Sequence, residues 1–164
     1  MFGWSKRRQE IGELFTRHVR PERAEAMKSP TFNPALNELS TVRVNFIAIA
    51  VQGESPSDVG RKLGLIADAA RAAGWYADYL FSNLAVLVDG PPLPKAAPRS
   101  KRLDLLAALQ QTLGATVKSV HGEVDAPWGN YGSAGRITFG AMLPDFLEVA
   151  AALHAQPYGS HVAR

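Results

Sequence analysis

The stretch VNFIAIAVQGES, residues 44–55, decides the fold. Its apolar run is rich in β-branched and aromatic residues, which predicts a strand over 42–51 that is buried on both faces. Between Val44 and Gly53 no side chain ionises. The strand therefore ends at a glycine, as an active-site strand would, without the charged groups that catalysis needs.

A helix is expected to follow the strand directly. Ser55 precedes Pro56 and stands three residues before Asp58, which is the pattern of a capped helix start. Apolar residues then recur at helical spacing, and the helix is expected to run to about Ala73 and to end at Gly74.

The remaining segments complete the order of elements. They are two short helices within 10–28, a hairpin over 75–90 that turns at Ser82-Asn83, a proline-rich loop, a helix over 103–113, a strand over 115–124, a loop over 125–135, a strand over 136–140, a helix over 143–154 and a tail over 156–164. This order predicts an α+β fold with a ferredoxin-like split βαβ sheet. We expect an N-terminal helical segment over 1–40 for signal transmission or dimerisation, a main domain over 41–156 and a tail over 157–164.

Composition narrows the class of protein. A chain of 164 residues with 46% hydrophobic and 20% charged residues is expected to form one ordinary globular domain. No cysteine is present, which excludes disulfides and thiolate metal sites and favours the cytoplasm. A net charge of +3 is too small to predict nucleic-acid binding. Residues 1–9 combine Phe2 and Trp4 with basic residues, and a solvated helix start is favoured there over contact with a membrane surface.

Several stretches together carry a resemblance to a known family. In IGELFTRHVRPERAEAMKSP, five residues match a helix–turn–helix pattern that bacterial cyclases carry before their first strand, namely Phe15, Arg17, Val19, Pro21 and Glu22. Further on, VNFIAIAVQG, GWYADYLFSNLAVLV and GNYGSAGRITFG look like the first strand, the hairpin and the loop and strand before the last helix. The chain thus resembles the class III nucleotidyl (adenylate/guanylate) cyclase catalytic domain from about Ile11 to Leu153.

The resemblance implies a metal site that this sequence lacks. Active members hold two divalent cations with an aspartate at the end of the first strand and another at the hairpin tip, because hard cations prefer carboxylate oxygens. The corresponding residues here are Ala50 and Asn83, with Ser82 in place of a glycine. A methyl group and a neutral amide therefore replace two negative charges, and we expect no metal and no cofactor.

The other functional positions that the resemblance implies are also substituted. Tyr79 and Ala141 stand where adenylate cyclases use a lysine and an aspartate to recognise the base. Pro144 and Glu148 stand where the family uses an asparagine and the arginine that stabilises the transition state. Because Glu148 would repel a polyphosphate, the sequence predicts a catalytically inactive domain, and nucleotide binding is not expected.

Aromatic residues are the remaining candidates for a ligand site or an interface. Trp75, Tyr76 and Tyr79 lie in the predicted hairpin, and Trp128 and Tyr131 lie in the predicted loop before Arg136. Packing in the core or at an interface is the favoured interpretation. The resemblance implies that the hairpin and the loop lie at or near the dimer interface, so we expect a homodimer, with a further protein partner as an additional expectation.

Two alternatives stay open at this point. The chain could be a nucleotidyl cyclase or another nucleotide-binding enzyme that uses other carboxylates, namely Asp78, Glu123 or Asp125. His121 and Glu123 alternate on a predicted strand and could share a metal, although no further ligand accompanies them.

Overall fold

The computed structural model describes residues 40–89, 100–133, 136–141 and 146–164. The predicted N-terminal helices and the start of the last helix at 143 lie outside these residues. Within them the elements are, in chain order, β1 (Ser40–Val51), α3 (Pro56–Ala72), β2 (Tyr76–Phe81), β3 (Leu84–Val88), α4 (Arg102–Leu113), a short 3₁₀ turn (Gly114–Thr116), β4 (Val117–Ser133), β5 (Arg136–Ala141), α5 (Phe146–Ala155) and β6 (His161–Ala163).

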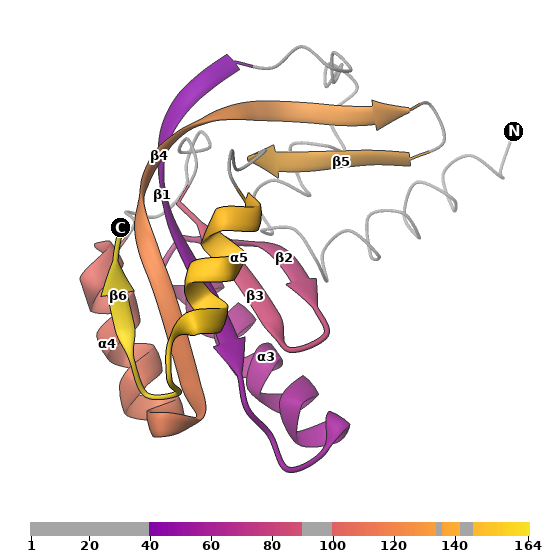
Figure 1. Cartoon of the computed structure of the whole chain (residues 1–164). Coiled ribbons are helices and arrows are strands. Elements are labelled where there is room, and N and C mark those ends of the chain that lie inside the picture. Colours follow the sequence, from indigo (N-terminus) through magenta and orange to yellow (C-terminus); the bar gives the residue numbers. More distant parts are fainter. Residues whose placement is uncertain (1–39, 90–99, 134–135, 142–145) are drawn as a thin grey trace, which may run out of the picture.

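The strands of the described part form one mixed six-stranded sheet in the order β2-β3-β1-β4-β5. All neighbours in this order are antiparallel, and β6 pairs with β4 in parallel. Figure 1 shows β1 and β4 as the two long central strands. The predicted α+β fold is confirmed.

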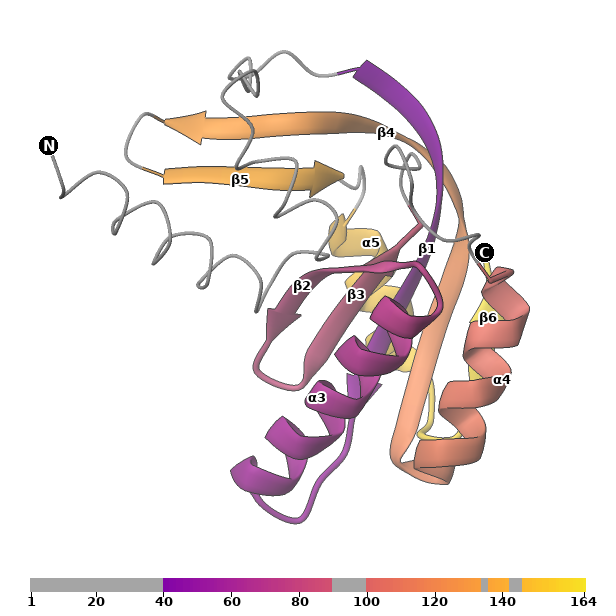
Figure 2. The same cartoon turned by 180° about the vertical axis from the view of Figure 1, so that it is seen from behind.

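Successive side chains of β1 point to opposite faces of the sheet, and they divide the core into two layers. Ile47, Ile49 and Val51 face α3 and α4, whereas Phe46 and Ala48 face the opposite side of the sheet. Figure 2 shows α3 and α4 together on one face, and Figure 1 shows α5 on the other. The first layer is completed by residues of the two helices and the hairpin, chiefly Ile66, Ala70, Trp75, Leu105 and Leu109. The second is completed by α5 through Val149 and Leu153.

The first helix begins as its sequence predicts. The hydroxyl of Ser55 accepts a hydrogen bond from the backbone N–H of Asp58 at 3.2 Å, and Pro56 occupies the first turn. The cap satisfies a backbone donor that would otherwise lack a partner. No described helix is both long and apolar enough to cross a membrane.

The loop predicted over 125–135 is wrong for most of its length, because β4 continues to Ser133. Pro127 fits this strand for a geometric reason. The N–H of Ser119 donates to Ser160 and the C=O of His121 accepts from Arg164, so the odd-numbered residues of β4 direct their backbone groups away from β1. The register with β1 is uninterrupted from Val117 to Trp128, so the backbone nitrogen of Pro127 also faces away from β1. Proline has no N–H, and at this position its absence costs no hydrogen bond to β1.

The tail predicted over 156–164 is also partly wrong. Residues 161–163 form β6, which pairs with 119–121 of β4. A strand of three residues has too little periodicity to be recognised in sequence, and only its pairing with β4 defines it.

Candidate functional site

The structure brings the two positions expected to carry metal ligands to the same end of the sheet. Ala50 pairs with Leu84 across β1 and β3, directly beside the hairpin tip at Asn83. The N–H of Val51 donates to the backbone oxygen of Asn83 at 2.8 Å, and the side-chain Nδ2 of Asn83 donates to the oxygen of Val51 at 3.2 Å. Ala50 is only 8% exposed. The two side chains therefore serve the sheet itself, one as packing and the other as a hydrogen-bond donor.

The hairpin turn uses a conformation that favours glycine. Ser82 has a φ of 55°, in the left-handed region, where a side chain costs about 1 kcal/mol. The resemblance places a glycine at this position, and the backbone here still has the corresponding shape.

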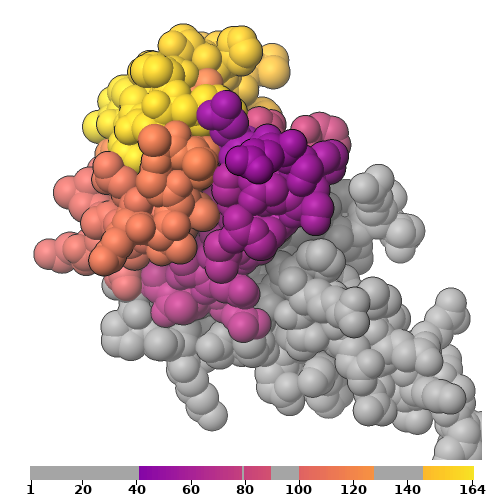
Figure 3. Space-filling model, turned by 90° about the horizontal axis from the view of Figure 1, so that it is seen from below, coloured from indigo at the N-terminus to yellow at the C-terminus, as the bar shows by residue number. Residues whose placement is uncertain are grey.

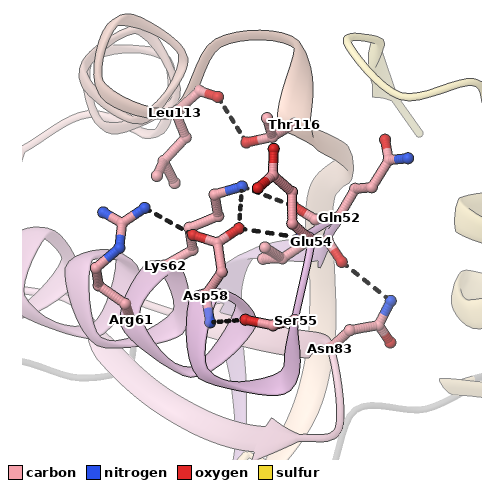
Figure 4. A network of polar contacts seen from close by, with 10 residues as sticks. Gln52, Glu54, Ser55, Asp58, Arg61, Lys62, Asn83, Leu113 and Thr116 are labelled. Atoms are coloured by element: carbon pink, nitrogen blue, oxygen red, sulfur yellow. Dashed lines mark hydrogen bonds and ion pairs between the residues drawn. The ribbon is translucent and has the colours of Figure 1, made fainter.

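A network of charged side chains closes the loop between β1 and α3 (Figure 4). Asp58 accepts a hydrogen bond from the N–H of Glu54 at 3.3 Å and forms ion pairs with Arg61 at 2.7 Å and Lys62 at 2.9 Å. Lys62 also donates to the backbone oxygen of Gln52 at 2.9 Å. The hydrogen bonds from Lys62 and Arg61 lower the pKa of Asp58 to about 2. The start of α3, where an external anion would be favoured, thus holds an internal carboxylate.

Gly53 is needed for this closure. A Cβ atom on Gly53 would lie 2.7 Å from Cγ2 of Val59 and 2.9 Å from Oδ2 of Asp58, both too close for ordinary contact. The glycine at the end of the strand therefore lets the loop pack against its own helix. The sequence carries two signals for this network, namely the cap formed by Ser55 and Asp58 and the i, i+4 spacing of Asp58 and Lys62.

The position expected to carry the transition-state arginine lies on α5. Glu148 forms an ion pair with Arg164, which follows β6. Pro144 lies outside the described residues. Tyr79 pairs with Val86 after an irregularity in β2, and Ala141 pairs with Trp128, but the structure describes only the backbone at Tyr79, Ala141 and Trp128.

The aromatic candidates do not all lie in one place. Trp75 is 1% exposed, and its Nε1 donates to the backbone oxygen of Ser100 at 2.9 Å. Tyr76 is 7% exposed and belongs to the layer on the α5 side. Tyr131 and Arg136 lie on β4 and β5, opposite Thr138 and Ser133 respectively, where the structure describes only the backbone.

The spare carboxylates are engaged or dispersed. Glu123 and Asp125 lie beside Arg43 at 3.5 and 3.2 Å, on the exposed surface of β4. Asp78 lies half-buried on β2, away from them in the sheet order. His121 is buried, whereas Glu123 is exposed and lies beside Arg43. Within the described residues, no three His, Asp or Glu side chains gather in a geometry that could hold a metal ion.

A second polar network, which the sequence does not predict, joins β1 to α4. The N–H and Nδ2 of Asn45 donate to the carboxylate of Asp89, each at 2.8 Å, and the Oδ1 of Asn45 accepts from Arg102 at 2.7 Å. In the sequence, Asn45 lies within the apolar run of the first strand and Asp89 near the end of the predicted hairpin. The three residues fasten the first turn of α4 to the sheet.

Comparison with known proteins bears on the fold. No protein-family model and no curated protein sequence matches the chain. Solved structures do match. The guanylyl cyclase Cya2 aligns with a TM-score of 0.53 and 14% identity over 76% of both chains. The adenylyl cyclase CyaB from P. aeruginosa aligns with a TM-score of 0.60 and 11% identity over 77% of this chain and 78% of its own. A bacterial light-regulated adenylyl cyclase aligns with a TM-score of 0.63 and 14% identity, over 96% of this chain and 53% of its own. The chain therefore has the fold of the class III nucleotidyl cyclase catalytic domain.

Proposed function

We propose that this chain is a catalytically inactive cyclase-like domain that acts as a homodimeric interaction, sensor or regulatory module. The observation that carries the proposal is the pair Ala50 and Asn83. These residues meet at the strand end where a metal site would be expected, and neither offers a carboxylate.

The chemistry of nucleotide cyclisation supports the proposal. Divalent cations activate the attacking hydroxyl and neutralise the triphosphate, and they need anionic oxygen ligands. A methyl group offers none, and the Asn83 amide points its N–H at the oxygen of Val51. The residues present do not fit two divalent cations, so we derive no reaction step through them.

Electrostatics at two separate places support the same conclusion. Asp58 already occupies the start of α3 with its own negative charge, which disfavours a phosphate there. Glu148 adds a second negative charge on α5 where a cation would be needed. A triphosphate would thus meet carboxylates, with Arg61, Lys62 and Arg164 already paired to them.

Exposed apolar side chains support an interaction role. Phe81 is 66% exposed at the end of β2, and Leu80 beside it is 43% exposed. Leu147 in the first turn of α5 is 82% exposed. These side chains would be available to a partner that covers the end of β2 or the start of α5.

Three measurements on the purified chain test the proposal. Incubation with ATP or GTP and Mn²⁺ should yield no cyclic nucleotide, and thermal melts should not shift with either nucleotide, because a ligand of the native state must raise its melting temperature. Light scattering should give the mass of a dimer. Turnover of either nucleotide would refute inactivity and favour an enzyme that uses other residues, and a monomer at high concentration would refute the dimer.

A further inference from the structure

A cluster of buried polar groups lies where the C-terminal strand meets the sheet, away from the strand end discussed above. The Oγ of Ser119 and the Nδ1 of His161 are 2.7 Å apart, which joins β4 to β6 by side chains as well as by backbone. Ser119 is 1% and His121 6% exposed. Ser119 pairs with Ile49, and His121 with Ile47, so both side chains lie on the face of the sheet that α4 covers.

Three nitrogen atoms of this cluster are buried without a hydrogen-bond partner. They are Nδ1 of His121, Nε2 of His161 and Nε of Arg102. Buried polar atoms without a partner are rare in native structures and weaken the segment that buries them. The two histidines and the arginine belong to β4, β6 and α4, so the deficit lies where the C-terminal strand meets the other two elements.

The charged side chain that acts most directly on His121 is Arg102. Arg102 lies at the start of α4, where its guanidinium donates to Asn45. The carboxylates that approach this face are already engaged, because Asp89 binds Asn45 and Glu123 lies beside Arg43. The remaining charged groups are Asp125 of β4, which lies beside Arg43, and the exposed Lys101 and Asp104 of α4. Lys118, Glu148 and Arg164 lie on the opposite face of the sheet.

We propose that residues 159–164 form a pH-sensitive latch, which docks on β4 while His121 and His161 are neutral and detaches when they become protonated. Protonation would place two further positive charges beside Arg102, where the carboxylates that approach among the described residues, Asp89 and Glu123, are already engaged by Asn45 and Arg43. Burial lowers the pKa of both histidines, and Arg102 and His161 lower that of His121 further. A lowered pKa means that docking is fully stable above the ordinary histidine pKa of about 6.5 and weakens as the pH falls below it.

The chain before the latch is held by contacts that do not depend on histidine. Lys118 donates to the backbone oxygens of His154 at 3.1 Å and Gln156 at 2.8 Å, and its ammonium group lies 4.8 Å from the centre of the Tyr158 ring. Gly159 follows with a φ of 87°, a conformation that suits a hinge. Figure 3 shows the C-terminal part of the chain lying against β4. Detachment would uncover the backbone groups of Val117, Ser119 and His121, an open strand edge that another strand could join.

Hydrogen–deuterium exchange of the intact chain tests the latch. Between about pH 7.5 and pH 5.5, after correction for intrinsic exchange, protection of the Ser119 and Arg164 amides should fall by at least about tenfold and by at most about a hundredfold. Each of the two histidines changes the docking equilibrium by at most about tenfold per pH unit below its ordinary pKa of about 6.5. Amides in β1 and α3 should keep their protection. Replacing both histidines, His121→Gln with His161→Gln, should remove the pH dependence, whereas His154→Gln on the exposed side of α5 should leave it unchanged.

Two results would overturn the proposal. One is equal loss of protection in the double variant and the unmodified chain. The other is loss of protection in β1 and α3 together with the latch, which would mean that acid unfolds the whole domain. Because the second comparison needs only the unmodified chain, it decides the question even if the double variant does not fold.

Discussion

Replacing Ala50 and Asn83 together by aspartate should create a metal site and weaken the protein in its absence. Position 50 is 8% exposed, so a carboxylate there would be largely buried. Burial that raises its pKa by about two units costs about 2.7 kcal/mol. At position 83 the change removes the donor to the oxygen of Val51, a hydrogen bond worth about 0.5–1 kcal/mol.

The metal-free double variant should therefore be less stable by about 3–4 kcal/mol. For a domain of this size, about 2–4 °C per kcal/mol converts this loss into a melting temperature lower by about 6–16 °C. A typical total stability of about 5–15 kcal/mol leaves the variant folded at low temperature.

Added Mn²⁺ should then restore much of the loss. A cation at about 100 times its dissociation constant stabilises the native state by about 2.7 kcal/mol, which corresponds to about 5–11 °C. The assay is a series of thermal melts at increasing Mn²⁺ for the double variant, the single variant Asn83→Asp and the unmodified chain. The reasoning is refuted if the double variant does not respond to Mn²⁺, or if the unmodified chain responds equally.

Three further changes test individual parts of the structure. Ser82→Gly should raise the free energy of unfolding by at most about 0.5 kcal/mol in urea melts, because about 1 kcal/mol of strain at φ 55° is removed while the unfolded chain gains flexibility worth about 0.4–1 kcal/mol; a loss of stability would show that the turn is unstrained. Trp75→Phe should lower it by about 2–3 kcal/mol, through the lost bond to Ser100 and the lost volume, and an unchanged value would contradict the buried placement. Asp58→Asn should destabilise the chain above about pH 4, and the difference should vanish toward pH 2, because the pKa of Asp58 is lowered from 3.8 to about 2 and its contribution is lost as the carboxylate protonates. The exposed Asp68→Asn on the same helix is the matched control, and a pH-independent effect at Asp58 would argue against the ion pairs.

Local patterns were sufficient for the elements that surround β1. The strand over 42–51, the cap at Ser55 and the turn at Ser82-Asn83 each depend on residues close together in the chain, and the structure has them all. The placement of Ala50 beside Asn83 was expected only from the resemblance to the cyclase family, because it depends on the pairing of β1 with β3, which α3 and β2 separate in the chain.

Pairing between distant segments could not be predicted in the same way. Pro127 and the glycines around it favour a loop by composition, yet β1 and β5 both pair with this stretch and make it a strand. The hydrogen bonds among the polar residues on the α4 face could not be predicted for a similar reason. Asn45, Asp89 and Arg102 are far apart in the chain, and nothing in their local sequence indicates that they meet.

The neutral residues at the strand end also suit the sheet in which they lie. If positions 50 and 83 were both aspartate, the carboxylate at position 50 would be buried beside the one at position 83. Only a bound cation could offset the cost of placing these two negative charges together. Without a cation, alanine packs into the layer on the α5 side and asparagine supplies a donor to Val51. The same forces act at Asp58, whose charge is balanced by Lys62 and Arg61 rather than by a ligand. Each of these arrangements stabilises the chain on its own and would oppose a metal-bound triphosphate, so stability and catalysis would require different residues at these positions.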